Sequence, residues 1–140
     1  MNIQAQIQAY IESLPTSKQA DIQALHQRLI QIFPNCKIWF FDGKNETGKV
    51  VSNPTIGYGT LEMKYANGKT KEWFRIGIST NQSGISVYLL GIEDKKYLDQ
   101  TYGQKLGKAS TSGYCIKFKK LQEINIEVLE EAIKDAYSRI

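Results

Sequence analysis

The chain has 140 residues and a formal net charge of +4, and 41% of its residues are hydrophobic. This length and composition fit one compact domain with its own core and exclude an intrinsically disordered chain. No apolar run approaches the roughly 20 residues that a membrane-spanning helix needs, which argues against a membrane protein. The start of the chain has no signal-peptide pattern, and its two cysteines form no C-x-x-C motif. We therefore expect a single cytoplasmic domain over residues 1–140.

Two helices are predicted at the start of the chain. Residues 2–14 carry apolar side chains at helical spacing, and Pro15 ends this helix because the residue before a proline is pushed out of the helical region. Thr16 and Gln19 have the spacing of a capping box, from which a second helix is expected to run to about Phe33. Each helix has one apolar stripe and is therefore expected to pack on a core.

The middle of the chain is predicted to form an antiparallel meander. Its strands are expected over residues 37–41, 56–65, 72–79 and 85–90, of which the first is a short apolar run and the last two place alternate residues on opposite faces. Residues 43–54 are rich in Gly, Asn, Lys and Pro and are predicted to be an exposed loop. Asn67-Gly68 lies between two strand-like runs, which is a strong hairpin signal.

The last part of the chain is predicted to hold a short helix over residues 93–102, a fifth strand over 114–120 and a final helix from Asn125 to about Arg139. The apolar positions of the fifth strand are expected to face the core: Tyr114, Ile116 and Phe118. This order of elements predicts an α+β fold. An antiparallel sheet of about five strands would carry the N-terminal helices and the C-terminal helix packed on one face.

Charge is unevenly distributed near the end of the chain. Residues 103–120 contain five lysines and no acid, whereas residues 121–140 contain five acids and two bases. The pattern is compatible with two solvated faces of opposite sign. It is also compatible with an anion site on the basic segment or a cation site on the acidic one.

Several short motifs occur in a particular order along almost the whole chain. They are YIESLP at residues 10–15, IGYG at 56–59, YANG at 65–68, WF at 73–74, ISVY at 85–88, LGK at 106–108 and GYCIKFKKL at 113–121. Their order resembles the YdhG-like family, small bacterial proteins built from one domain of unknown function. The resemblance implies an α+β fold. Some relatives are described as frataxin-like intracellular iron chaperones, which makes iron the cofactor implied by this alternative. The family often has Lys-Thr-Gly-Lys before the final strand, whereas here Tyr114 follows Gly113 and the expected positive charge is missing.

The glycines and lysine at 103–108 suggest a phosphate-binding loop at first sight. A P-loop has four residues between its first glycine and Gly-Lys, but only three residues separate Gly103 from Gly107, and Ala109 follows Lys108. A nucleotide-hydrolysing site is therefore excluded. A looser anion site made by backbone amides and side chains is left open, beside the alternative of a tight turn with solvated polar groups. Its side chains would be Lys108, Ser110, Thr111 and Ser112.

A ligand pocket is predicted near the middle of the sheet. Gly57 and Gly59 remove side chains from one face of a strand, and this would leave a slot beside Trp73, Tyr88 and Tyr114. An apolar ligand or the side chain of a protein partner could enter such a slot. The alternative is that the final helix fills the slot, or that the glycines permit a bulge or close packing.

Acidic residues of the final helix are candidate iron ligands, because carboxylates are hard oxygen donors. Glu127, Glu130, Glu131 and Asp135 recur at intervals of three and four residues and are expected to share an outward face. The alternative is an ordinary amphipathic helix whose solvent side is charged. Lys134 also lies among these acids.

Nucleic acid and catalysis are disfavoured by the pattern. Lys117 and Lys119 alternate with Tyr114 and Phe118, which places the aromatics on the opposite face from the lysines and argues against stacking on bases. His26 is the only histidine, and no nucleophile motif frames a serine or cysteine. We therefore expect a non-catalytic binding protein for an unknown small ligand or protein partner, able to form a homodimer through an exposed sheet edge or face. The alternative is a frataxin-like iron chaperone.

Overall fold

The computed structural model describes residues 2–81 and 84–138. Its helices are α1 (Ile3–Glu12), α2 (Thr16–Ile32) and α3 (Ile126–Ser138), with a π-helical turn η1 (Asp99–Gly103) and a 3₁₀ turn η2 (Leu121–Glu123). Its strands are β1 (Ile38–Phe41), β2 (Thr55–Tyr58), β3 (Leu61–Lys64), β4 (Thr70–Trp73), β5 (Ile76–Asn81), β6 (Gly84–Leu89), β7 (Ala109–Thr111) and β8 (Cys115–Phe118). Among the described residues, no helix has both the length and the apolar character that crossing a bilayer requires.

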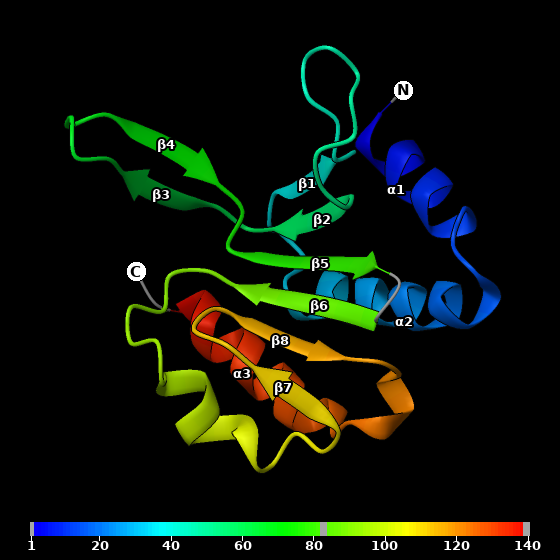
Figure 1. The fold of residues 1–140 in the computed structure, drawn as a ribbon, viewed down its shortest axis with the longest axis vertical. Helices are drawn as coiled ribbons and strands as arrows, with labels where there is room; N and C mark the ends of the chain where they lie inside the picture. The colour runs from blue at the N-terminus through cyan, green and yellow to red at the C-terminus, as the bar shows by residue number, and fades with distance from the viewer. Residues whose placement is uncertain (1, 82–83, 139–140) are drawn as a thin grey trace.

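The strands form a six-stranded antiparallel sheet in the order β1-β2-β5-β6-β8-β7, and β3 and β4 form a separate two-stranded sheet. Helices α2 and α3 lie behind the six-stranded sheet in Figure 1, and α1 lies beside β1. The predicted α+β architecture, with N-terminal helices and a C-terminal helix packed on an antiparallel sheet, is confirmed. The sheet differs from the prediction in having six strands, because residues 109–111 add the edge strand β7.

The two strands predicted over residues 56–65 and 72–79 are each divided in two. Gly59 has a positive φ of 77°, a conformation that breaks the extended chain between β2 and β3. On the return, Phe74 and Arg75 separate β4 from β5. The β3–β4 hairpin therefore leaves the main sheet and projects from it, as Figure 1 shows.

Two local predictions about helix ends have opposite outcomes. The capping box expected at Thr16 is wrong: Pro15 is the N-cap of α2, and no side chain caps this end. Proline presets a φ suited to a helix start, and its carbonyl accepts a hydrogen bond from the Gln19 amide at 2.8 Å. Asn125 does cap α3, because its Oδ1 accepts from the Glu127 amide at 3.1 Å.

The core lies between the sheet and the helices. Successive strand residues point to opposite faces, and the inward residues are almost fully buried: Ile56, Tyr58, Ile76, Ile78, Ile85, Val87, Leu89, Ile116 and Phe118. The helices contribute a matching apolar set: Ile7, Ile11, Ile22, Leu25, Leu29, Leu129, Ile133 and Ala136. Burying one such Leu or Ile side chain contributes about 1.5–3 kcal/mol, so this layer fixes the helices on the sheet.

Candidate functional site

The face of the six-stranded sheet that points away from α2 and α3, called here the open face, carries several of the predicted site residues. On β6, Ile85, Val87 and Leu89 point to the helices. Ser86 and Tyr88 alternate with them and therefore point to the open face. The open face holds two cavities, one basic and one aromatic.

A row of polar side chains crosses the open face. Thr55, Ser79 and Ser86 are successive cross-strand neighbours on β2, β5 and β6. On the far side of Ser86, Lys117 of β8 pairs with both Ser86 and Ser110 of β7. The Lys117 side chain therefore emerges between two serines.

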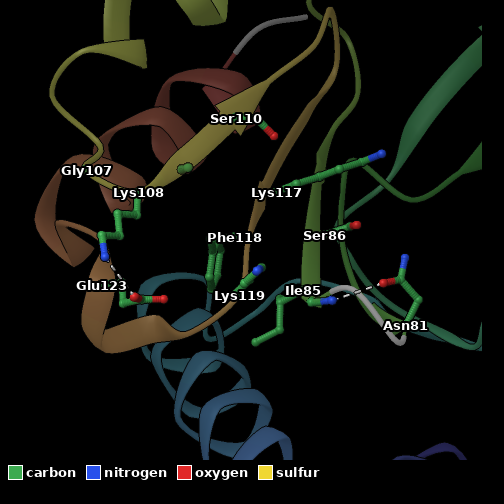
Figure 2. A pocket seen from close by; sticks show the side chains of 12 residues that line it. Asn81, Ile85, Ser86, Gly107, Lys108, Ser110, Lys117, Phe118, Lys119 and Glu123 are labelled. Atoms are coloured by element: carbon green, nitrogen blue, oxygen red, sulfur yellow. Dashed lines mark hydrogen bonds and ion pairs between the residues drawn. The ribbon is translucent and has the colours of Figure 1, made fainter.

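A cavity of about 600 Å³, called here the basic groove, lies at this end of the row. Its described polar lining consists of Asn81, Ser86, Lys108, Ser110, Lys117, Lys119 and Glu123. Figure 2 shows the Lys117 chain extending past Ser86, and the Ser110 hydroxyl pointing toward the groove. Lys108 Nζ lies 3.4 Å from the Glu123 carboxylate, an exposed and weak ion pair. Because three lysines face one acid among these residues, the groove carries net positive charge.

The predicted anion site is brought together in part. Lys108 and Ser110 line the basic groove, but Thr111 alternates to the other face of β7, where its hydroxyl donates to the Asp99 carboxylate at 3.0 Å. Sequence reasoning missed the contributions of Lys117 and Ser86 to the same site. Alternation along the strand predicts that Lys117 points away from the core. It does not show which strands lie on either side, and these strands are what place Lys117 between Ser86 and Ser110.

A second cavity of about 710 Å³, called here the aromatic hollow, lies beside the root of the β3–β4 hairpin. Its aromatic lining is Phe40, Phe41, Trp73, Phe74, Tyr88 and Tyr114, and residues of the 43–53 loop close one side. The Phe41 and Trp73 rings are stacked with centroids 4.7 Å apart, and Tyr88 stacks on Tyr114 at 6.2 Å.

The prediction that Tyr114 points to the core is wrong. Tyr114 is 54% exposed, whereas Ile116 and Phe118 are buried as predicted. The regular strand begins only at Cys115, so alternation does not extend back to Tyr114. Its ring instead lies against Tyr88 on the open face.

The slot predicted at Gly57 and Gly59 is filled by the chain itself. A Cβ on Gly57 would lie 2.6 Å from the Cβ of Phe74, and a Cβ on Gly59 would collide with the ring of Tyr137 from α3. The glycines thus allow close packing of two aromatic rings, one on each face of the sheet. Trp73 and Tyr88, predicted beside the slot, instead line the aromatic hollow.

Lysine ammonium groups lie over both tryptophans of the chain. Lys37 Nζ lies 4.1 Å from the ring centroid of Trp39, and Lys71 Nζ lies 4.6 Å from that of Trp73. These are cation–π contacts at partly exposed rings. Positive charge therefore borders the aromatic side chains of the open face.

The four carboxylates predicted to bind iron do not form one cluster: two of them hydrogen-bond to different partners and the other two are exposed. Glu130 accepts a hydrogen bond from Arg28 at 2.6 Å, and Asp135 accepts from the hydroxyls of Tyr97 and Tyr102. Burial and the neighbouring Asp135 carboxylate raise the pKa of Tyr102, which keeps this phenol a hydrogen-bond donor. Glu127 and Glu131 are exposed. Within residues 2–81 and 84–138, no three His, Cys, Asp or Glu side chains are grouped closely enough to hold one metal ion.

His26 and Cys115, which a histidine-based catalytic pair would need, are both buried. His26 is 5% exposed, and its Nδ1 lies 2.5 Å from the Tyr58 hydroxyl on the helix side of the sheet. Burial lowers the pKa of His26. Cys115 lies on the other face of the sheet, and burial raises the pKa of its thiol.

Comparison with known proteins gave no relative: a scan of protein-family models, a search of curated proteins and a search of solved structures each found no match to this chain. The resemblance to the YdhG-like family, and the iron-chaperone activity that it implies, therefore stay predictions from the sequence. The functional proposal rests instead on the residues that line the two cavities of the open face.

Proposed function

We propose that the chain is a non-catalytic binding protein that takes an anionic ligand in the basic groove. The observation that carries the proposal is that Lys108, Lys117 and Lys119 line one cavity together with Ser86 and Ser110. Ammonium and hydroxyl groups are hydrogen-bond donors that suit phosphate or carboxylate oxygens.

The charges of the groove set the expected strength of binding. A unit charge 4 Å from an ammonium group gains about 4 kcal/mol at the effective dielectric of a protein surface, and salt screens this attraction. Lys108 is already paired with Glu123 and its side chain is 79% exposed. Lys117 is also exposed, but no acid is paired with it among the described residues, and it is therefore expected to contribute most.

The proposal of a non-catalytic role draws on the state of the candidate catalytic groups. His26 is hydrogen-bonded to the Tyr58 hydroxyl in the core, away from the open face that carries both cavities. The raised thiol pKa of Cys115 disfavours the thiolate, which is the nucleophilic form of cysteine.

Isothermal titration with pyrophosphate at low salt tests the proposal. Lys117→Gln is expected to weaken binding at least about tenfold, because a charge-assisted hydrogen bond contributes about 1.5–3 kcal/mol. The matched control is Lys134→Gln, which removes an exposed lysine of α3 outside the groove and is expected to leave the affinity unchanged. Absence of binding to the parent, or equal weakening by both substitutions, would contradict the proposal.

A further inference from the structure

The aromatic side chains of the open face share that face with lysines. Alternation along the fifth predicted strand placed its aromatics opposite Lys117, but the exposed Tyr114 stacks on Tyr88, which points the same way as Ser86. Lys117 is the cross-strand neighbour of Ser86 and also belongs to this face. The sequence argument against base stacking therefore does not hold for Tyr114, although it holds for the buried Phe118.

The projecting hairpin extends the same arrangement. Lys71 and Trp73 of β4 lie two residues apart and so point to one side of the hairpin. Glu62 and Glu72 are directly paired with each other and point to the other side. The acids of β3 and β4 are thus turned away from the face that carries Lys71 and Trp73.

The aromatic hollow and the basic groove are adjacent. Tyr88 lines the hollow and Ser86 lines the groove, and the two residues are neighbours on the same face of β6. At about 3.4 Å per residue, their backbone positions lie roughly 7 Å apart. A ligand could therefore place a ring against Tyr88 or Tyr114 while an attached anion reaches Lys117.

We infer that the open face binds single-stranded nucleic acid, with phosphates at the basic groove and bases stacked on the exposed ring of Tyr114 and the partly exposed rings beside it. This inference rests on the proposed anion site and names the class of ligand. Single-strand binding combines a positively charged path for the backbone with aromatic platforms for successive bases. The open face provides both, and the lysines over Trp39 and Trp73 add positive charge beside the rings.

Fluorescence anisotropy with a labelled oligothymidylate of about 12 nucleotides measures this binding, since such sites span roughly 4–16 nucleotides. Tyr114→Ala is expected to weaken binding about 5- to 150-fold, the range for losing one stacked base. Engagement of about four lysines predicts that log K falls with log salt at a slope near −3, and Lys117→Gln is expected to reduce the slope by about 0.7.

Intrinsic fluorescence gives a second readout, because the two tryptophans of the chain, Trp39 and Trp73, both lie on the open face. Stacked bases are expected to quench them, whereas pyrophosphate is not. The matched control is Tyr65→Ala, which removes an exposed tyrosine outside both cavities and is expected to change affinity less than about twofold.

The outcomes separate this inference from the anion proposal. Oligonucleotide binding that quenches tryptophan and is weakened by Tyr114→Ala but not by Tyr65→Ala supports it. Pyrophosphate binding without tighter binding of the oligonucleotide would overturn the inference and leave the anion site standing. Equal affinity for a duplex of the same length, or an unchanged affinity in Tyr114→Ala, would also overturn it, because stacking needs unpaired bases.

Discussion

Phe74 packs over two glycines of the sheet, which makes Gly77→Ala a sharp test of the structure. Phe74 is 7% exposed, and a Cβ on Gly77 would lie 2.6 Å from its Cε2 and 3.2 Å from its Cδ2 and Cζ. Phe41 and Trp73 hold the ring at centroid separations of 5.7 and 5.4 Å, so the ring cannot move aside freely. Forcing a methyl group into such packing costs about 1–3 kcal/mol, and Gly77→Ala is expected to lower the free energy of unfolding by that amount.

A double-mutant cycle with Phe74→Ala isolates the clash. Phe74→Ala alone is expected to cost about 3–5 kcal/mol, because it removes a buried ring. In that background the new methyl group meets no ring, so Gly77→Ala is expected to change the free energy of unfolding by less than about 0.5 kcal/mol. Urea denaturation followed by circular dichroism measures all four proteins. An equal cost of Gly77→Ala in both backgrounds would show that Phe74 does not fill the space above Gly77.

Three further predictions concern buried or partly buried polar groups. Because burial lowers the pKa of His26, the unfolded chain binds a proton more readily than the folded one. The free energy of unfolding should therefore fall as the pH drops below about 6.5, and urea titrations at two pH values should show a smaller fall in His26→Gln. Cys115 is 2% exposed, so its thiol should react with a disulfide reagent only at the rate of unfolding, and rapid reaction in the native state would contradict its placement. Asp135→Asn should cost about 1–3 kcal/mol, since Asp135 accepts hydrogen bonds from Tyr97 and Tyr102, and an unchanged urea midpoint would show that these bonds add nothing.

The helix-covered face of the sheet could be predicted because its signal is local. Alternation alone places Ile85, Val87, Ile116 and Phe118 inward, and all four are buried. The same rule fails at Tyr114, where the strand has not yet begun and the ring finds a neighbour on another strand.

The candidate site could be predicted only in part because it depends on pairings between distant segments. Ser110 and Lys117 meet because the three-residue strand β7 pairs with β8, and a strand so short leaves no periodic signal. Gly57 reveals that a side chain is missing, but nothing in its neighbourhood along the chain indicates that Phe74 occupies the space.

The central claim, that the basic groove of the open face is an anion site, is tested most directly by residue-resolved chemical-shift mapping. Pyrophosphate would be titrated into nitrogen-15-labelled protein at low salt. The amides expected to shift belong to Ser86, Lys108, Ser110 and Lys117 and to their immediate neighbours. Shifts centred instead on the exposed surface of α2 and α3 near Arg28 and Lys134, or spread without a centre, would contradict the claim.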